Sequence, residues 1–545
     1  MPTLLPRALH ERALEGDFEL TPETTMTAPP ALVEPALRLQ EQLRHATGFV
    51  LPITIVEHGA AHHTGIRFEQ DDRLDEEGFE LTVTPAGVRI GAAVERGAHW
   101  AAQALLQLFP ATIHRRAPLP STVPWRAPAR EIRDSPRFSW RGAMLDVVRH
   151  FAPPRDIRRF IDLLAMHRLN TLHLHLTDDQ GWRIEIARYP KLTEVGSWRP
   201  ESQVGAAPES DGDGRPHGGF YTKDDLREIV AYASARGITV VPEIELPGHA
   251  QAAVAAYPEL GVGDAAPETP WTRWGINPVI FNVEESTIAF LADVLDEVID
   301  IFPSEYICIG GDECPKVQWR DDPRTQERMR ELGVEEEEEL QSWFIGRIAA
   351  HLASRGRKLL GWDEILEGGL VDDASVLSWR GQIGALVAAR AGHDVIACPV
   401  DSVYLDYRES DMPGEPIPVG TVTTVETAYG FDPVPPELNA TEARHVRGGQ
   451  ANLWTEHIDS SRAIDYHVFP RLCAVSEALW TRGDRDFREF EPRLVEHLAR
   501  LDAAGVEYRH PDGPRPWQSR PGVVGRPSSM EDAVAHLERI TANIG

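Results

Sequence analysis

From Trp140 to about residue 482, short apolar runs alternate with longer segments in which apolar residues recur every three or four positions. The short runs predict buried strands, and the longer segments predict amphipathic helices. The predicted strands are Ala143–Val148, Thr171–Leu176, Thr239–Ile244, Tyr306–Ile309, Lys358–Gly361, Ser375–Ser378, Asp394–Ala397 and Arg447–Leu453. Helical patterns lie between most of them, including Pro154–Arg168, Lys223–Arg236, Glu284–Ile301 and Glu335–Ser354. Eight such alternations predict a (β/α)8 barrel, an α/β TIM barrel with insertions.

An open, doubly wound parallel sheet is the alternative that this alternation allows. We find no glycine-rich phosphate loop after any predicted strand, which disfavours that alternative. Two insertions interrupt the pattern. The segment Glu201–Gly219 is rich in Gly, Pro and Asp and is expected to form a mobile loop. The segment Gly261–Pro278 carries Trp271 and Trp274 and is a candidate for the rim of a pocket.

A different pattern precedes the barrel. Residues from about 15 to 120 contain a strand at Leu51–Val56, a hairpin at Phe79–Ile90 and a helical segment at Glu95–Phe109. Residues 117–130 are rich in Pro and Arg, as expected of a linker.

These patterns divide the chain into three parts. We predict a small α+β domain at residues 1–125, the barrel at 126–482, and a C-terminal helical tail at 483–545 with a Pro-rich break near 511–527.

The composition limits the partners of the protein. Hydrophobic residues make up 42% of the chain and charged residues 26%, as in ordinary globular proteins. The formal net charge of −30 comes without any evident basic cluster, which argues against nucleic acid or an anionic membrane as partner. A neutral substrate fits this balance better.

The N-terminal segment and the cysteines bear on location. Residues 1–30 lack an apolar core of the length that a signal peptide needs, and no segment of the sequence has the length and apolarity of a membrane span. The four cysteines, Cys308, Cys314, Cys398 and Cys473, have neither metal-ligand spacing nor a paired pattern. We therefore expect a cytoplasmic protein with reduced thiols.

The most informative local feature is Gly310-Gly-Asp-Glu313, which follows the fourth predicted strand. The glycines allow the backbone to bend, and the two carboxylates then lie at the carboxyl end of a strand, where barrels place their chemistry. An isolated sequence of this kind is more often a solvated acidic turn. The residues that follow the other strands favour a functional site instead.

If the barrel is correct, the residues that follow its strands converge on one face. They include carboxylates, an imidazole, a guanidinium and three indoles, a set that suits carbohydrate, because indoles stack on sugar rings and charged groups bind hydroxyls. The candidates are Arg149, Asp178, His249, Asp312, Glu313, Trp362, Trp379, Tyr404, Asp406, Trp454 and Glu456. Taken singly, each has an ordinary structural explanation, such as core packing or an ion pair.

The adjacency of Asp312 and Glu313 constrains the mechanism. A conventional retaining glycosidase places its nucleophile and its acid about 5–5.5 Å apart on opposite sides of the scissile bond. Neighbouring side chains diverge on extended backbone, so this pair is poorly placed for those two roles. One of them is better suited to donate a proton while the other holds the substrate. The nucleophile then comes from another strand or from the substrate, for example from a 2-acetamido group.

Six ordered segments resemble the family 20 glycoside hydrolases, the β-N-acetylhexosaminidases. They start at Phe138-Ser-Trp-Arg-Gly and Leu174-His-Leu-Thr-Asp-Asp, continue through Pro242-Glu-Ile-Glu-Leu-Pro-Gly-His249, Gly310-Gly-Asp-Glu313 and Gly361-Trp362, and end at Gly448-Gly-Gln-Ala-Asn-Leu-Trp454. The resemblance covers about residues 130 to 480, and the preceding α+β unit looks like the domain that often precedes this barrel. It implies hydrolysis of terminal, non-reducing β-linked N-acetylglucosamine or N-acetylgalactosamine, with retention and through an oxazolinium intermediate.

The resemblance also implies residue roles. Glu313 would be the general acid and base, Asp312 would hold the acetamido N–H, and Tyr404 would bind the acetamido oxygen. Asp178 and His249 would support Glu313. Arg149 and Glu456 would bind ring hydroxyls, and Asp406 would lie near O6 or its leaving-group neighbour. Trp362, Trp379 and Trp454 would wall the pocket, with Trp454 beneath the ring. We expect no cofactor and no metal. One departure is Cys308, at a position that is often histidine in the family, where we expect altered packing rather than lost catalysis.

Other hypotheses stay open at this point. A conventional retaining glycosidase could use Asp178 as nucleophile, and a barrel without catalysis could simply bind carbohydrate. A zinc site built from His173, His175, Asp178 and His249 is less favoured, because the two strand histidines lie on a strand face distinct from its end. The expected partner is a small oligosaccharide or glycoconjugate, and a homodimer is possible. The sequence does not decide between the gluco and galacto configurations.

Overall fold

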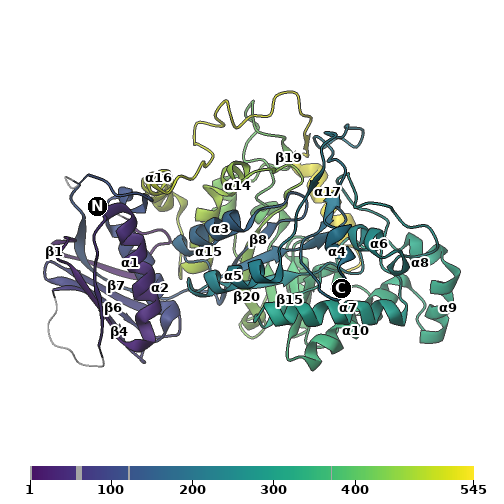
Figure 1. Ribbon diagram of the computed structural model, residues 1–545, viewed down its shortest axis with the longest axis horizontal. Coiled ribbons are helices and arrows are strands. Elements are labelled where there is room, and N and C mark those ends of the chain that lie inside the picture. Colours follow the sequence, from purple (N-terminus) through teal and green to yellow (C-terminus); the bar gives the residue numbers. More distant parts are fainter. Residues whose placement is uncertain (1–2, 57–63, 121–122, 370, 545) are drawn as a thin grey trace.

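The computed structural model describes residues 3–56, 64–120, 123–369 and 371–544. A β-sheet with helices forms one end of the molecule, and a barrel enclosed by helices forms the rest (Figure 1). Within these ranges, none of the helices combines the length and the apolar character that a bilayer crossing needs.

The larger part is a closed barrel of eight parallel strands, which confirms the predicted fold and excludes the open sheet. Each predicted strand overlaps one barrel strand. In chain order these are β8 (Trp140–Asp146), β9 (Thr171–His175), β14 (Thr239–Glu243), β15 (Tyr306–Cys308), β16 (Lys358–Trp362), β17 (Ser375–Ser378), β18 (Val395–Ala397) and β20 (Val446–Leu453). Consecutive strands pair throughout, and β20 pairs with β8 to close the ring.

Amphipathic helices cover the outside of the barrel, among them α3 (Pro154–Met166), α5 (Lys223–Ser234), α7 (Glu285–Ile301) and α10 (Glu337–Ser354). The start of α5 illustrates how the sequence fixes them. Thr222 Oγ1 accepts the N–H of Asp225 (3.1 Å), and the Asp225 carboxylate accepts the N–H of Thr222 (2.9 Å), a reciprocal cap. The buried face of α5 then carries Leu226, Ile229 and Ala233.

The first barrel strand ends earlier than predicted. The sequence favours a strand that extends to Val148, whereas β8 ends at Asp146. The Asp146 carboxylate accepts the backbone N–H groups of Val148 (2.7 Å) and Arg149 (3.1 Å), so the chain turns there. This turn places Arg149 beside the carboxyl ends of the strands.

The N-terminal domain is a mixed sheet, with α1 (Val33–Thr47) and α2 (Glu95–Leu108) packed on it and on each other. Its described strands, in spatial order, are β1 (His10–Glu19), β7 (Arg126–Asp134), β5 (Phe79–Thr84), β6 (Gly87–Ala92), β4 (Gly65–Gln70), β2 (Thr25–Ala28) and β3 (Ile53–Ile55).

The predicted linker at 117–130 and the domain boundary after residue 125 are wrong from Arg126 onward. Residues from Arg126 onward form β7, which pairs with β1 and β5 inside the N-terminal sheet, so this domain extends to Asp134. Pro128 favoured a linker in the prediction. In the structure it lies opposite Asp17, where the register shifts, and a proline is tolerated at such an irregularity in a strand. Residues 121–122 of the predicted linker lie outside the described residues.

The two domains meet around Trp480, at the end of α15 (Arg471–Trp480). Its ring lies 6.3 Å from that of Trp100 and 6.5 Å from that of Phe79, both in the N-terminal domain. Its indole N–H donates to Asp134 (2.9 Å), which also pairs with Arg168 (2.8 Å). The junction is therefore a packed, hydrogen-bonded interface.

After the barrel the chain forms α16 (Phe487–Ala504), then crosses the top of the view in Figure 1 and descends as α17 (Met530–Ile540). Just before α17, the short strand β21 (Arg526–Pro527) pairs in parallel with β19 (Val419–Gly420), in the loop between β18 and β20. The predicted tail thus returns to the barrel.

The insertion at Glu201–Gly219, predicted as a mobile loop, contains regular backbone pairing. Strands β12 (Trp198–Arg199) and β13 (His217–Gly218) pair at its base, and Gln203 bridges to Gly212 within it. The N–H of Ala206 donates to the carbonyl of Val524 in the C-terminal tail (2.8 Å). The insertion and the C-terminal tail are therefore in contact.

Candidate active site

The carboxyl ends of the barrel strands surround a cavity of about 460 Å³. Its lining includes Arg149, His249, Asp312, Glu313, Trp362, Trp379, Tyr404, Asp406, Trp454 and Glu456. All of the predicted site residues except Asp178 thus line one cavity, and Asp178 lies just beneath it in contact with two of them. This volume is in the range of pockets that hold small ligands, about 300–1,000 Å³.

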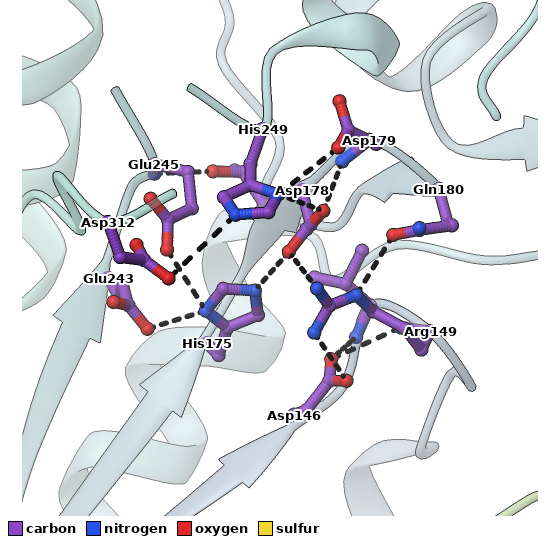
Figure 2. A network of polar contacts seen from close by, with 12 residues as sticks. Asp146, Arg149, His175, Asp178, Asp179, Gln180, Glu243, Glu245, His249 and Asp312 are labelled. Carbon is purple, nitrogen blue, oxygen red and sulfur yellow. Dashed lines mark hydrogen bonds and ion pairs between the residues drawn. The ribbon is translucent and has the colours of Figure 1, made fainter. Parts of the chain in front are cut away.

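Asp178 is the centre of a buried polar network (Figure 2). Its Oδ2 atom lies 2.7 Å from Arg149 Nη2 and 3.0 Å from His175 Nε2, and its Oδ1 atom lies 3.2 Å from His249 Nδ1. The Oδ1 atom also accepts the backbone N–H of Asp179 (2.5 Å). Burial alone raises the pKa of Asp178, but Arg149 and His249 outweigh it and hold the pKa well below its usual value. Both oxygens are therefore already engaged.

His175 connects Asp178 to the floor of the cavity, a connection that the sequence did not reveal. Its Nδ1 lies 2.5 Å from Glu243 Oε2, and its Nε2 contacts Asp178. Burial lowers the pKa of His175, but Glu243 and Asp178 raise it to about 10, so the ring is an imidazolium at neutral pH. His175 was expected on a strand face distinct from the strand end; it is the last residue of β9, and its ring reaches Asp178 beyond that end. Glu243 in turn accepts the indole N–H of Trp362 (2.8 Å).

His249 joins this network to the two adjacent carboxylates. Its Nδ1 lies 3.1 Å from Asp179 Oδ2 and close to Asp178, and its Nε2 lies 3.8 Å from both Asp312 Oδ2 and Glu313 Oε2. His249 and Glu313 both have positive φ, +51° and +41°, which is costly for side chains of this size. Backbone strain is therefore present on both sides of the 3.8 Å contact between His249 and Glu313.

Glu313 has the proton affinity of a general acid. Burial and the neighbouring Asp312 raise the pKa of Glu313 to about 7, although His249 opposes them. About a third of the side chain is exposed (35%), and it lines the cavity. A carboxyl group with this pKa is largely protonated just below neutral pH and can donate to a bound substrate.

Asp312 offers an unused acceptor to the same cavity. Within the described part of the chain, its buried Oδ1 atom has no hydrogen-bond partner. Burial raises the pKa of Asp312, with His249 opposing. Gly310 (φ +64°) is required behind it, because a Cβ there would lie 1.6 Å from Glu245 Oε2. Burial and Asp312 raise the pKa of Glu245 well above its usual value.

Aromatic rings form one wall of the cavity. Trp454 lies 5.8 Å from Trp362 and 6.5 Å from Tyr404, which stacks on Trp379 at 6.2 Å between ring centroids. The indole N–H of Trp379 donates to Glu364 (3.0 Å), which fixes the ring. Such a wall accepts the apolar face of a sugar and small apolar substituents.

Other parts of the cavity lining are polar. Asp406 Oδ1 is buried and, in the described residues, also lacks a partner. Burial and Glu456 raise the pKa of Asp406 to about 8. The Arg149 guanidinium packs over the Trp454 ring at 5.0 Å. Together these groups offer donors and acceptors for several hydroxyls next to an aromatic face.

The comparisons with known proteins agree with this geometry. The sequence model of the glycosyl hydrolase family 20 catalytic domain matches residues 138–483, and that of domain 2 of this family matches residues 1–135. The chain belongs to glycosyl hydrolase family 20. The domain-2 match also supports the extension of the N-terminal domain through β7.

Named relatives are similar over most of the chain. A Beta-hexosaminidase of Porphyromonas gingivalis is 42% identical over 514 residues, which are 93% of this chain and 64% of that protein. The chain thus spans somewhat less than two thirds of that relative. A family 20 β-N-acetylhexosaminidase structure from Streptomyces coelicolor superposes with a TM-score of 0.80 at 31% identity, covering 94% of this chain and 98% of the other.

A second structure carries a bound sugar. The family 20 exo β-N-acetylglucosaminidase of Vibrio harveyi, in complex with N-acetylglucosamine, superposes with a TM-score of 0.82 at 34% identity. The match covers 93% of this chain and 78% of that one.

Potential metal ligands also meet in this family 20 site. His249, Asp312 and Glu313 bring three ligand atoms within 4.8 Å of one another, as do Asp178, Asp179 and His249. The Arg149 guanidinium lies 2.7 Å from Asp178 and disfavours a second cation beside it. We interpret both groups as sites of proton sharing and substrate binding.

Cys308, at the position that often holds histidine in the family, is buried beneath the site. Its Sγ lies 3.3 Å from Glu243 Oε1, the same carboxylate that holds His175. Burial and Glu243 raise the pKa of Cys308 well above its usual value, so it is a neutral thiol. Cys308 therefore donates a weak hydrogen bond to Glu243, which still contacts His175.

Proposed function

We propose that the protein is an exo-acting, retaining β-N-acetylhexosaminidase that releases terminal β-linked N-acetylglucosamine or N-acetylgalactosamine. The observation that carries the proposal is a pair of adjacent residues: Asp312, whose Oδ1 has no partner among the described residues, and Glu313, whose pKa is about 7. An acetamido N–H can donate a hydrogen bond to Asp312 Oδ1, and Glu313 can donate its proton to a glycosidic oxygen. The similarity to a Beta-hexosaminidase and to an exo β-N-acetylglucosaminidase supports the same substrate class.

In the proposed mechanism the substrate supplies the nucleophile. The acetamido N–H donates to Asp312 Oδ1, and the Tyr404 hydroxyl donates to the acetamido oxygen and positions it. That oxygen attacks the anomeric carbon, and the glycosidic C–O bond breaks as Glu313 transfers its proton to the leaving oxygen. The product of this step is an oxazolinium ion, whose positive charge the Asp312 carboxylate stabilises.

The second step reverses these roles. The Glu313 carboxylate accepts a proton from a water molecule, whose oxygen attacks the anomeric carbon from the face that the leaving group vacated. The oxazolinium ring opens to restore the acetamido group, and Glu313 is protonated again. Two inversions at one carbon give net retention of configuration.

A conventional retaining mechanism with Asp178 as nucleophile is less compatible with the geometry. A nucleophilic carboxylate needs a free oxygen that faces the anomeric carbon. Asp178 lies beneath the cavity, and its oxygens contact Arg149, His175 and His249. The second alternative is a barrel that only binds sugar. It does not account for the pKa of Glu313, which suits a proton donor.

The pH dependence of turnover is one expected consequence. Glu313 must be protonated to donate, so kcat/KM falls by about tenfold per pH unit above a midpoint near pH 7, the pKa of Glu313 in the free enzyme. The measurement is kcat/KM for N,N′-diacetylchitobiose, whose leaving sugar oxygen needs the proton, from about pH 4 to about pH 9. A profile that stays flat to the alkaline end of this range contradicts the assignment.

The proposed activity itself is tested with native protein. We expect hydrolysis of p-nitrophenyl N-acetyl-β-glucosaminide, its galacto epimer, or both, and proton NMR is expected to detect the β-anomer of the released sugar first. First appearance of the α-anomer excludes retention. Failure to hydrolyse either compound excludes the proposed activity.

A further inference from the structure

The outer part of the cavity is built by a segment outside the family match. That match ends at residue 483, whereas α17 begins at Met530. The lining of the cavity nevertheless includes, from this segment, Ser528, Met530, Asp532, Ala533, Val534, His536 and Leu537. The C-terminal helix therefore shares one continuous cavity with the candidate catalytic residues.

Both ends of α17 are attached to the rim of the barrel. At its start, β21 pairs with β19, and the N–H of Ser528 donates to the carbonyl of Gly420 (2.8 Å). At its end, Arg380 Nη1 donates to the carbonyl of Ile540 (2.8 Å). Arg380 follows Trp379 directly and is itself fixed by Asp363 (2.8 Å). The helix is thus held to the barrel at both of its ends.

The face that α17 turns to the cavity is apolar. Met530, Ala533, Val534 and Leu537 recur at helical spacing and all line the cavity. Every residue of this helix is at least partly exposed, and Met530 and Val534 remain 56% and 46% exposed. An apolar stripe that is not covered by protein and that faces a substrate cavity offers its surface to the substrate.

Two polar groups of α17 lie along one edge of this stripe. Asp532 and His536 also line the cavity. Arg539 Nη2 donates to His536 Nδ1 (2.8 Å), which leaves the Nε2 of His536 as the donor. An apolar strip with an acceptor and a donor along one edge suits a pyranose, which has C–H groups on its faces and hydroxyls at its edge.

We propose that α17 forms the outer wall of a leaving-group subsite, where its apolar stripe packs on the C–H face of the sugar ring that the reaction releases. The inference rests on the proposed function. An exo-acting enzyme holds the terminal sugar at the bottom of the cavity, beside Asp312, Arg149 and Asp406. The remainder of the substrate then lies at the mouth, against Val534 and Leu537.

The test compares two substrates on full-length protein. N,N′-diacetylchitobiose releases a sugar ring, whereas methyl N-acetyl-β-glucosaminide releases only methanol. In the double variant Val534→Asn/Leu537→Asn, kcat/KM for the disaccharide is expected to fall by about tenfold, the effect of losing a few apolar contacts in a pocket. For the methyl glycoside, kcat/KM is expected to stay within about twofold of native.

The matched control is Ala535→Asn, which places the same side chain on the same helix at a position that does not line the cavity. It is expected to behave as native protein on both substrates, and thermal unfolding of all variants is expected to match native. Unchanged disaccharide turnover in the double variant overturns the subsite, and so does an equal loss on both substrates. Native protein that cleaves neither substrate overturns the proposed function and, with it, this inference.

Discussion

Replacement of Glu313 by Gln is expected to lower kcat on N,N′-diacetylchitobiose by about 10²- to 10⁴-fold, the usual contribution of a positioned general acid. The amide has nearly the shape of the carboxyl group but cannot donate the proton that the leaving sugar oxygen needs. A p-nitrophenolate leaving group needs that proton less, so the loss in the bond-breaking step is expected to be smaller on the aryl glycoside. The difference between the two substrates identifies the missing acid.

The pH profile provides the second readout for this variant. The alkaline limb near pH 7, which we assign to the pKa of Glu313, is expected to disappear in Glu313→Gln. A control is Glu426→Gln, an exposed position on α13 (Val425–Gly430), which is expected to leave both kcat and the profile unchanged. Retention of the limb in Glu313→Gln shows that another group is the acid.

Replacement of Asp312 by Asn is the second change for which a large effect is expected. We expect kcat to fall by about 10²- to 10³-fold on N-acetyl substrates, because the neutral amide cannot stabilise the positive oxazolinium ring. KM is expected to change much less, since the side-chain oxygen can still accept the acetamido N–H. Steady-state kinetics on p-nitrophenyl N-acetyl-β-glucosaminide measure both parameters.

The stability of Asp312→Asn separates a catalytic from a structural role. Burial raises the pKa of Asp312, so its carboxylate is held in the folded protein at a cost. The melting temperature of the variant is therefore expected to equal or exceed that of native protein at neutral pH. A lower melting temperature together with the kinetic loss contradicts the account, because it indicates that Asp312 mainly supports the fold.

The barrel and most of the pocket were predictable from local sequence. Parallel strands buried on both faces appear as short apolar runs, and their carboxyl ends carry the chemistry, so residues such as Arg149 and Trp454 could be assigned to one face from the sequence pattern alone. The roles that the family resemblance implies for these residues stay predictions.

The inner layer of the site was not predictable in the same way. His175 and Glu243 lie within strands rather than after them, and sequence alone does not say that their side chains point into the barrel and meet. A signal was present, because a charged residue inside an apolar strand needs a buried partner. Two such residues on paired strands β9 and β14 satisfy each other.

The position of α17 was also hidden. The sequence predicts a helical tail but not where it docks, because the docking depends on β21 and on Arg380, far apart along the chain. Similarly, β7 was mistaken for a linker because its Pro and Arg content outweighed a strand pattern that becomes evident only beside β1 and β5.

The central claim is that the substrate's own acetamido oxygen attacks the anomeric carbon. It is tested most directly by native turnover of p-nitrophenyl β-glucosaminides that carry N-acetyl, N-fluoroacetyl, N-difluoroacetyl and N-trifluoroacetyl groups. Fluorine withdraws electrons from the amide oxygen and weakens it as a nucleophile, so kcat is expected to fall steeply with each fluorine, by about 10²-fold or more across the series. Rates that do not change along the series contradict the account and indicate a nucleophile supplied by the protein.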